Sequence, residues 1–343
     1  MTDLATQINT IKPLSGQAIY LPDTDGQAAS WHLWKQNEVN AICAALAAQR
    51  PLLVRGEPGT GKSQLARAAA VALGWRLHTC ALHARSEPHD LLYQFDAVRR
   101  LADAQAQKWH ADDENRYWQP QALWLALNLS SAHEFGSLRT LPDEVPWPPP
   151  DGHVVLIDEI DKAPADVPNG LLDVIGARRF EVPALGLQVN AVGGQWPLVI
   201  ITTNEERELP AAFQRRCMVL SHSCQHQDGY TGFLLAHAQA HFGPGRGSDA
   251  AVIDADVLQL AAEQLAQDRT QAQQAQLPPP GLAEYLDLLY ALHNLAPGDT
   301  TQQRYWLNQL NQYAYLKNHI EPHQAQGLQQ QADGVRRIAE AGK

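Results

Sequence analysis

Short runs of apolar residues alternate, between residues 51 and 221, with stretches in which apolar positions recur every three or four residues. A short apolar run bounded by polar residues predicts a buried strand, and the longer period predicts an amphipathic helix. The predicted strands are 51–55, 75–80, 154–158, 198–203 and 218–221, and the predicted helices are 62–73, 90–101, 168–175 and 210–216. Strands that alternate with helices predict a parallel sheet covered on both faces, which is an α/β fold.

The two ends of the chain show other patterns. Residues 1–36 have no clear period, so we expect them to be irregular up to a helix that begins near Asn37. After residue 224 the apolar runs stop, and helical patterns follow at 257–265, 283–295 and 305–316. We therefore expect two domains, an α/β domain over residues 1–224 and a helical domain over residues 225–343.

A stretch of about 93–150 interrupts the α/β pattern, and we interpret it as an insert. Its later part is rich in proline around Trp147, which predicts an extended connection on the surface. Its earlier part mixes charged and aromatic residues without a period. We expect the aromatic side chains of Trp109, Tyr117 and Trp118 to be exposed there and to face a pore or a partner protein.

Composition narrows the class of protein. The chain has 343 residues, of which 45% are hydrophobic and 18% charged, and its net charge is −11. The apolar content argues against intrinsic disorder, and the negative charge disfavours nucleic acid as a partner. The longest apolar run, 41–48, is too short to cross a membrane, and the first residues do not resemble a signal peptide. Four cysteines without framework spacing fit a reducing compartment, so we expect a cytoplasmic protein.

A phosphate-binding motif follows the first predicted strand. The sequence GEPGTGKS matches the P-loop pattern G-x-x-x-x-G-K-[ST] and consists of Gly56, Glu57, Pro58, Gly59, Thr60, Gly61, Lys62 and Ser63. Glycines let the backbone N–H groups point at phosphates, and the next helix adds the positive end of its dipole. Lys62 is expected to contact the β- and γ-phosphates, and the Ser63 hydroxyl to bind Mg²⁺. No Asn-Lys-x-Asp element for guanine is present, so ATP is favoured over GTP.

Polar residues follow two further predicted strands. Asp158 and Glu159 end the strand at 154–158, where Asp158 is expected to hold Mg²⁺ and Glu159 to polarise the attacking water. Asn204 follows the strand at 198–203, where an amide can bind both the γ-phosphate and that water. Arg215 and Arg216 end the predicted helix at 210–216. They provide either favourable charge at a helix C-terminus or an arginine finger for a neighbouring subunit.

This order of motifs resembles that of AAA+ ATPases. Within them, IDEIDKAPADVPNGLLDVIGARRFEVPALG (157–186) and ITTNEERELPAAFQRRC (201–217) resemble the MoxR family, and residues 90–105 and 116–127 resemble the insert in helix 2 of that family. The resemblance implies a five-strand parallel αβα core with a smaller all-helical lid. It also implies a sensor-1 role for Asn204, and a finger role for Arg216 rather than Arg215, because Arg216 directly precedes the strand.

The resemblance further implies an assembly and a partner. AAA+ proteins of this kind form rings, so we expect a homo-hexamer that hydrolyses ATP with Mg²⁺ and remodels a partner protein, such as one with a von Willebrand factor A domain. One feature departs from the pattern, because the stretch that corresponds to the sensor-2 helix start, LPPPGLAEYL (277–286), holds no basic residue.

Two alternative functions remain open at this stage. A McrB-like nucleic-acid translocase shares the helix-2 insert, and Tyr117, Trp118 and Trp124 near Arg116 could stack on bases. A nucleotide-switched signalling scaffold with negligible turnover would fit the missing sensor-2 arginine. The cluster of His222, Cys224 and His226 is a weak candidate for zinc, because it lacks the two ligand pairs of a structural zinc site.

Overall fold

The computed structural model describes residues 3–24, 27–106, 111–136, 152–192, 196–224, 229–243 and 253–314. The chain divides into two compact units, Met1–Ser223 and Cys224–Lys343. Trp109, Trp147 and His226 lie outside the described residues, so the structure does not test what the sequence predicts for them.

Five parallel strands form the main sheet of the first unit, in the order β11-β3-β10-β7-β4. The strands are β3 (Leu52–Arg55), β4 (Arg76–Ala81), β7 (His153–Asp158), β10 (Leu198–Thr203) and β11 (Met218–Ser221). Each starts within one residue of its predicted start and ends within one residue of its predicted end. The predicted five-strand parallel sheet is therefore confirmed.

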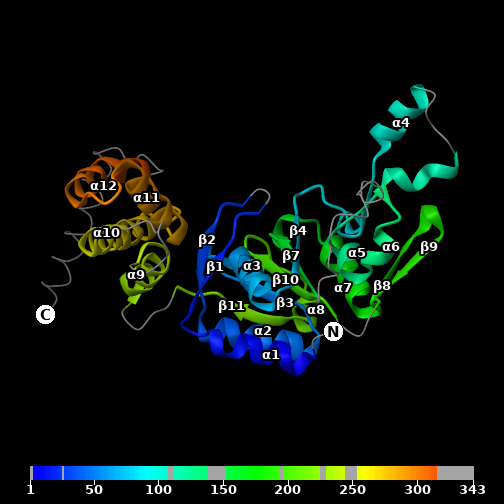
Figure 1. Cartoon of the computed structure of the whole chain (residues 1–343), viewed down its shortest axis with the longest axis horizontal. Coiled ribbons are helices and arrows are strands. Elements are labelled where there is room, and N and C mark those ends of the chain that lie inside the picture. Colours follow the sequence, from blue (N-terminus) through cyan, green and yellow to red (C-terminus); the bar gives the residue numbers. More distant parts are fainter. Residues whose placement is uncertain are drawn as a thin grey trace, which may run out of the picture. The chain divides into compact units, whose positions relative to one another are not determined.

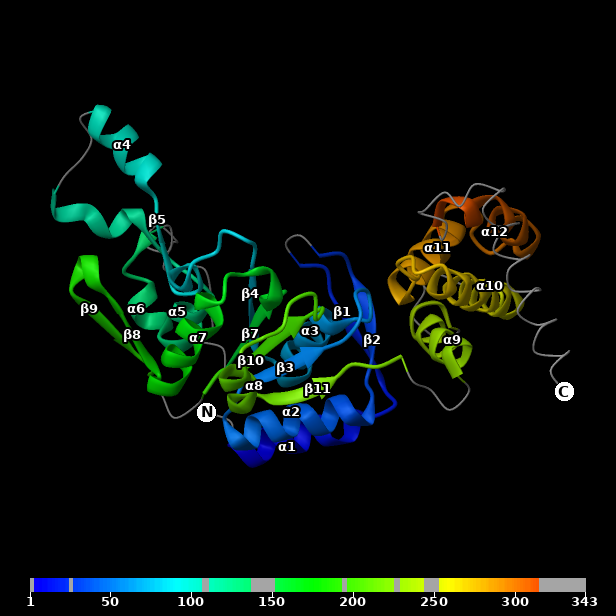
Figure 2. The same cartoon turned by 180° about the vertical axis from the view of Figure 1, so that it is seen from behind.

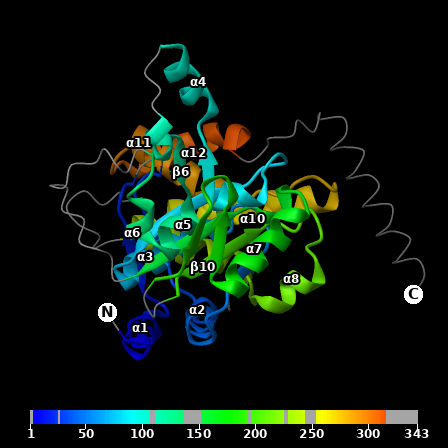
Figure 3. The ribbon, with the colours of Figure 1, turned by 90° about the vertical axis from the view of Figure 1, so that its right-hand side faces the viewer.

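Helices cover both faces of this sheet (Figure 1). Alternate strand residues divide between two cores: Leu53, Val155 and Val199 pack with α5, α7 and α8, whereas Leu52, Val154 and Leu198 pack with α1, α2 and α3. The helices of the first face are α5 (Ala122–Leu127), α6 (Leu129–Ala132), α7 (Asp166–Ala177) and α8 (Ala211–Arg216), and those of the second are α1 (Leu4–Ile11), α2 (Gln36–Ala48) and α3 (Lys62–Leu73). Figure 3 shows α1 and α2 side by side.

The prediction that residues 1–36 are irregular is wrong. They contain α1 and an antiparallel hairpin of β1 (Ala18–Leu21) and β2 (Ser30–Leu33). Strands of four residues are too short to show a clear period, and the hairpin is held from outside. The Arg67 guanidinium, on α3, donates to the carbonyl oxygens of Pro22 at 2.9 Å and Ala28 at 3.2 Å, in the connection between the two strands.

The insert also differs from its prediction. The expected helix over 90–101 is interrupted by β5 (Tyr93–Phe95), which pairs with β6 (Trp118–Pro120), before α4 (Ala97–Gln105) begins. Tyr117 is fully buried and Trp118 only 9% exposed, so the predicted exposure of these two aromatics is wrong. The Trp118 ring packs on Tyr93 and Phe95 across the hairpin. What the insert does expose is α4, which projects away from the sheet (Figure 2).

A second hairpin, β8 (Arg179–Val182) with β9 (Leu187–Asn190), was not predicted either. The described residues of the first unit also contain short 3₁₀ turns at Lys12–Leu14, Pro88–Leu91, Ala111–Tyr117, Ile160–Lys162 and Pro183–Leu185.

The described residues of the second unit form only helices, which confirms the predicted helical region after the sheet. They are α9 (Gly229–Phe242), which was not predicted, α10 (Ala255–Gln274), α11 (Leu282–Leu295) and α12 (Thr300–Ala314). Their core includes Phe233, Leu265, Tyr285 and Leu289. Among the residues described, no helix is both long and apolar enough to span a membrane.

Candidate active site

The predicted phosphate loop joins β3 to α3 and depends on its glycines. Gly59 has φ 72° and Gly61 has φ 93°, in the left-handed region that favours glycine. Gly56 has φ 149°, and a Cβ atom built on it would lie only 2.5 Å from the carbonyl oxygen of His222. The first glycine of the motif is therefore required by close backbone packing, and the other two by the curl of the loop.

Lys62 lies at the start of α3 and is 6% exposed. Its ammonium group donates to the carbonyl oxygens of Gly56 at 2.8 Å and Glu57 at 2.7 Å, and to Asn204 Oδ1 at 2.7 Å. Burial lowers the pKa of Lys62, and the carboxylate of Asp158 is the strongest opposing charge. The ammonium is thus surrounded by oxygen acceptors. Phosphate oxygens are acceptors of the same kind and could take their place.

Ser63 and Asp158 meet as the sequence predicts for a Mg²⁺ site. The Ser63 hydroxyl donates to Asp158 Oδ1 at 2.8 Å and lies 3.0 Å from Oδ2. The Thr202 hydroxyl, on β10, donates to the same carboxylate, and it also accepts the backbone N–H of Glu159 at 2.9 Å. Hydroxyl and carboxylate oxygens are the donors that Mg²⁺ prefers, so these residues fit the ion.

Glu159 directly follows β7 and has φ 56°, a left-handed conformation that is uncommon outside glycine. A 3₁₀ turn begins after it, and side chains three residues apart eclipse in such a turn. Accordingly Lys162 Nζ lies 2.7 Å from Glu159 Oε2, while Asn204 Nδ2 donates to Oε1 at 3.3 Å. A continuous chain of hydrogen bonds therefore joins Lys62, Asn204, Glu159 and Lys162.

Thr202 and Lys162 were missed at the sequence level. Thr202 is the first of two polar residues at the end of an otherwise apolar buried strand, and this was an available signal. Lys162 gave no signal before the turn was known, because a lysine after two acids is ordinary surface composition.

Arg215 and Arg216 occupy the last turn of α8, and both are exposed. Neither forms a hydrogen bond or an ion pair with any residue of the described part of the chain. The structure therefore brings Lys62, Ser63, Asp158, Glu159 and Asn204 together but leaves both arginines outside that group.

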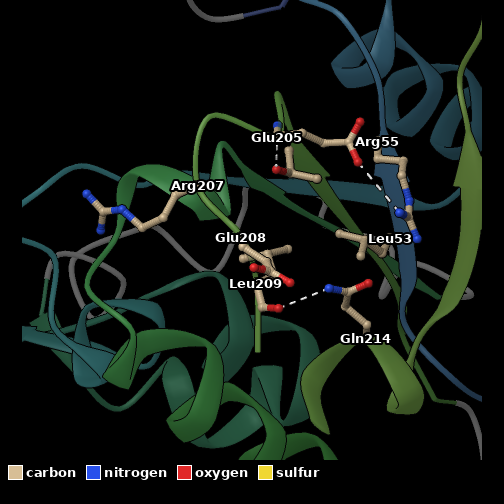
Figure 4. A pocket seen from close by; sticks show the side chains of 8 residues that line it. Leu53, Arg55, Glu205, Arg207, Glu208, Leu209 and Gln214 are labelled. Atoms are coloured by element: carbon tan, nitrogen blue, oxygen red, sulfur yellow. Dashed lines mark hydrogen bonds and ion pairs between the residues drawn. The ribbon is translucent and has the colours of Figure 1, made fainter. Parts of the chain in front are cut away.

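A cavity of about 370 Å³ lies beside the loop that follows β10 (Figure 4). It is lined by Leu53, Arg55, Thr203, Glu205, Arg207, Glu208, Leu209 and Gln214. Arg55 and Glu205 form an ion pair of 3.5 Å at its edge, and Gln214 donates to the carbonyl oxygen of Leu209 at 2.9 Å. Because it contains none of the predicted site residues, we do not assign the nucleotide phosphates to it.

His222 has a structural partner instead of a metal. Its Nε2 lies 2.7 Å from Glu38 Oε1, and His32 lies 3.3 Å from the other oxygen of this fully buried carboxylate. Burial alone would raise the pKa of Glu38, but the hydrogen bonds from His222 and His32 hold it well below its usual range. No group of three metal-ligating side chains occurs within the described ranges.

The residues on which base stacking depended are also in the core. Tyr117 and Trp124 are fully buried, so neither ring is available to a base.

The match to one family model agrees with this arrangement. Residues 51–217 match the family model of the AAA domain of the dynein-related subfamily. No curated protein matches the chain. A protein described as an ATPase from Cytophaga hutchinsonii ATCC 33406 has 11% identity and a TM-score of 0.39, with 98% of this chain and 91% of that chain covered. A RuvB variant from Thermotoga maritima has 16% identity and a TM-score of 0.38, with 80% and 68% covered.

Four of the five sheet strands, β3, β4, β7 and β10, lie within the matched range, as do the P-loop between β3 and α3 and the polar residues after β7 and β10. Residues 51–217 of this chain therefore match an AAA domain, and the structure places them in a five-strand parallel core that a helical region follows.

Proposed function

We propose that this protein is a MoxR-like AAA+ ATPase that hydrolyses ATP with Mg²⁺ in an oligomeric ring and remodels a partner protein. The observation that carries the proposal is the hydrogen-bond chain from Lys62 through Asn204 to Glu159, with Ser63 and Asp158 paired beside it. These hydrogen bonds link Lys62, which is predicted to bind phosphate, to Glu159, the predicted base. The three residues follow three different strands, β3, β10 and β7.

The proposed chemistry follows from these side chains. Mg²⁺ would be held by Ser63 and Asp158 and would neutralise phosphate charge when nucleotide is bound. Lys62 would exchange the loop carbonyls for phosphate oxygens, since both are acceptors for its ammonium group. Glu159 would accept a proton from water, and the Asn204 amide would hold that carboxylate and the γ-phosphate in one frame.

Arg216 is the residue that we propose to complete the site of a neighbouring subunit. Its guanidinium is exposed at the end of α8 and has no partner among the described residues, so it is available to a second copy. Arg215 precedes it in the same turn and is the second candidate for this role. An arginine finger contributes about 10³- to 10⁵-fold to turnover where such residues have been measured.

The ring is tested by mixing two inactive variants. Glu159→Gln and Arg216→Ala should each be nearly inactive alone, because one lacks the base and the other the finger. Mixed, they should regain partial ATPase activity, since some interfaces then pair an intact Glu159 with an intact Arg216. Absence of recovery at every ratio, with co-assembly verified by size, would contradict a role of Arg216 between subunits.

The partner is proposed as a protein and not as a nucleic acid. The net charge of −11 disfavours phosphate-rich partners, and the two fully buried aromatics of the insert cannot stack on bases. Exposed Val98 and Leu101 on α4 are apolar, which is a property that a protein surface can complement.

A further inference from the structure

The 3₁₀ turn after β7 contains a buried acid to which the sequence analysis gave no role. Asp161 is 3% exposed, and its Oδ2 accepts the backbone N–H groups of Asn204 at 3.1 Å and Glu206 at 3.0 Å. These donors belong to the loop after β10, whereas Asp161 follows β7, its neighbour in the sheet. A single carboxylate oxygen thus joins the turn after β7 to the loop after β10 by two hydrogen bonds.

The loop that Asp161 holds does not have a relaxed conformation. Between its two donors, Glu205 has φ 60°, in the left-handed region that is unfavourable for a residue with a side chain. A left-handed residue between two others turns backbone N–H groups to the same side and forms a small anion-binding concavity. In this protein the anion in the concavity is the side chain of Asp161.

Asp161 affects the predicted site through Asn204. Its backbone N–H is fixed by Asp161, and its side chain then reaches Lys62 Nζ at 2.7 Å and Glu159 Oε1 at 3.3 Å. If the Asp161 oxygen is removed, two buried N–H groups lose their acceptor and the loop no longer has a reason to keep Glu205 left-handed. The Asn204 amide would then lose its position between the phosphate lysine and the base.

We propose that Asp161 is a positioning residue for ATP hydrolysis, which places the Asn204 amide by binding the backbone of its loop. This inference rests on the proposed function, because it assigns Asp161 a role in that reaction. Asp161 does not contact the reacting atoms. The property that this role requires is the hydrogen-bond acceptor and not the charge, since both groups that Oδ2 binds are neutral backbone N–H groups.

Three substitutions separate the acceptor from the charge. Asp161→Asn keeps one oxygen for both N–H groups, so we expect its kcat to stay within threefold of the parent. Asp161→Ala removes the acceptor, so kcat should fall about 10- to 100-fold, as for a catalytic group displaced by about 1 Å. The KM for ATP should change less than threefold, because the P-loop is untouched. Asp161→Leu leaves the same N–H groups unpaired while refilling the space, and it replaces Ala if Ala does not fold.

A readout independent of activity checks the same claim. Amide hydrogen exchange in a peptide that covers residues 203–208 should become at least tenfold faster in Asp161→Ala and stay unchanged in Asp161→Asn. Asp173→Ala, an exposed acid on α7, is the matched control and should change neither exchange nor turnover.

The outcomes distinguish this inference from the proposed function. If the parent chain shows no ATP turnover that Glu159→Gln abolishes, the proposed function fails. If it does, and Asp161→Ala or Asp161→Leu keeps parent kcat and parent exchange, the positioning role is overturned while the function stands. A loss in Asp161→Asn as large as in Asp161→Ala would also overturn it, because the charge and not the acceptor would then be required.

Discussion

Replacement of Glu159 by glutamine tests the predicted base with the smallest change in shape. In the parent, Oε1 accepts from the Asn204 amide and Oε2 faces the Lys162 ammonium. Asn204 cannot turn its amide around, because its own oxygen is bound by Lys62 at 2.7 Å. The new glutamine must therefore present its oxygen to Asn204 and its NH₂ group to Lys162. We expect it to keep the first contact and lose the second.

The expected magnitudes follow from these contacts. A general base contributes roughly 10²- to 10⁴-fold, so kcat should fall by that factor, which is about 3–5 kcal/mol of barrier. Stability should change little, because the lost ion pair is between side chains that are 37% and 41% exposed. Nucleotide affinity should be kept, since Lys62, Ser63 and the loop glycines are unchanged.

Phosphate release under saturating Mg²⁺-ATP measures kcat, and a fluorescent ATP analogue measures affinity. Glu181→Gln, an exposed glutamate on β8, is the control and should behave as the parent. The assignment of Glu159 as the base would be refuted by turnover within threefold of the parent. It would also be refuted by a loss of affinity that matches the loss of turnover, because a base acts on the chemical step.

Two further predictions concern the P-loop lysine and a buried histidine pair. Lys62→Ala should fold, with a stability loss of up to about 2 kcal/mol from its hydrogen bonds, and should bind ATP at least tenfold more weakly; a titration with the fluorescent analogue checks this. His78 Nε2 lies 2.9 Å from His153 Nδ1, and burial lowers the pKa of His78 to about 3 and that of His153 to about 4. In the unfolded chain both histidines have a pKa near 6.5, so between pH 4 and 6.5 the unfolded state binds more protons than the folded state. The free energy of unfolding should therefore reach its full value above pH 6.5. It should fall by up to about 1.4 kcal/mol per pH unit for each histidine as the pH drops toward 4. Denaturant unfolding at pH 7.5 and 5.5 should show this loss and a smaller one in His153→Gln.

The strands of the main sheet were predictable because a strand buried on both faces is a continuous run of apolar residues. The run at 198–203 is apolar up to two threonines and matches β10 residue for residue. The elements of the insert were not predicted correctly, because the apolar residues of 90–101 recur at helical spacing although they belong to a strand and to a helix. Asp96 was the missed signal, since its side chain accepts the N–H of Arg99 and caps α4. A helix that begins at an N-cap cannot include the strand before it.

The site divides in the same way between what motifs determine and what topology determines. Spacing within the P-loop predicts the roles of Lys62 and Ser63 from local chemistry alone. The contacts of Asp161 and Lys162 depend on which strands are neighbours and on a left-handed turn after β7, and neither is encoded in a short motif. Sequence reasoning therefore identified the groups expected to contact nucleotide and missed those that hold them.

The bonds of Lys62 predict that folding and nucleotide binding are separable in this protein. A buried ammonium without acceptors would destabilise the fold, yet here three oxygens accept from it within 2.8 Å. Phosphate oxygens would replace acceptors that already exist, so binding is an exchange of hydrogen bonds and not the rescue of an unpaired charge. One of the exchanged partners is Asn204 Oδ1, whose amide holds the carboxylate of Glu159. Under the proposed function, a phosphate that binds at Lys62 would therefore act directly on the amide that positions Glu159.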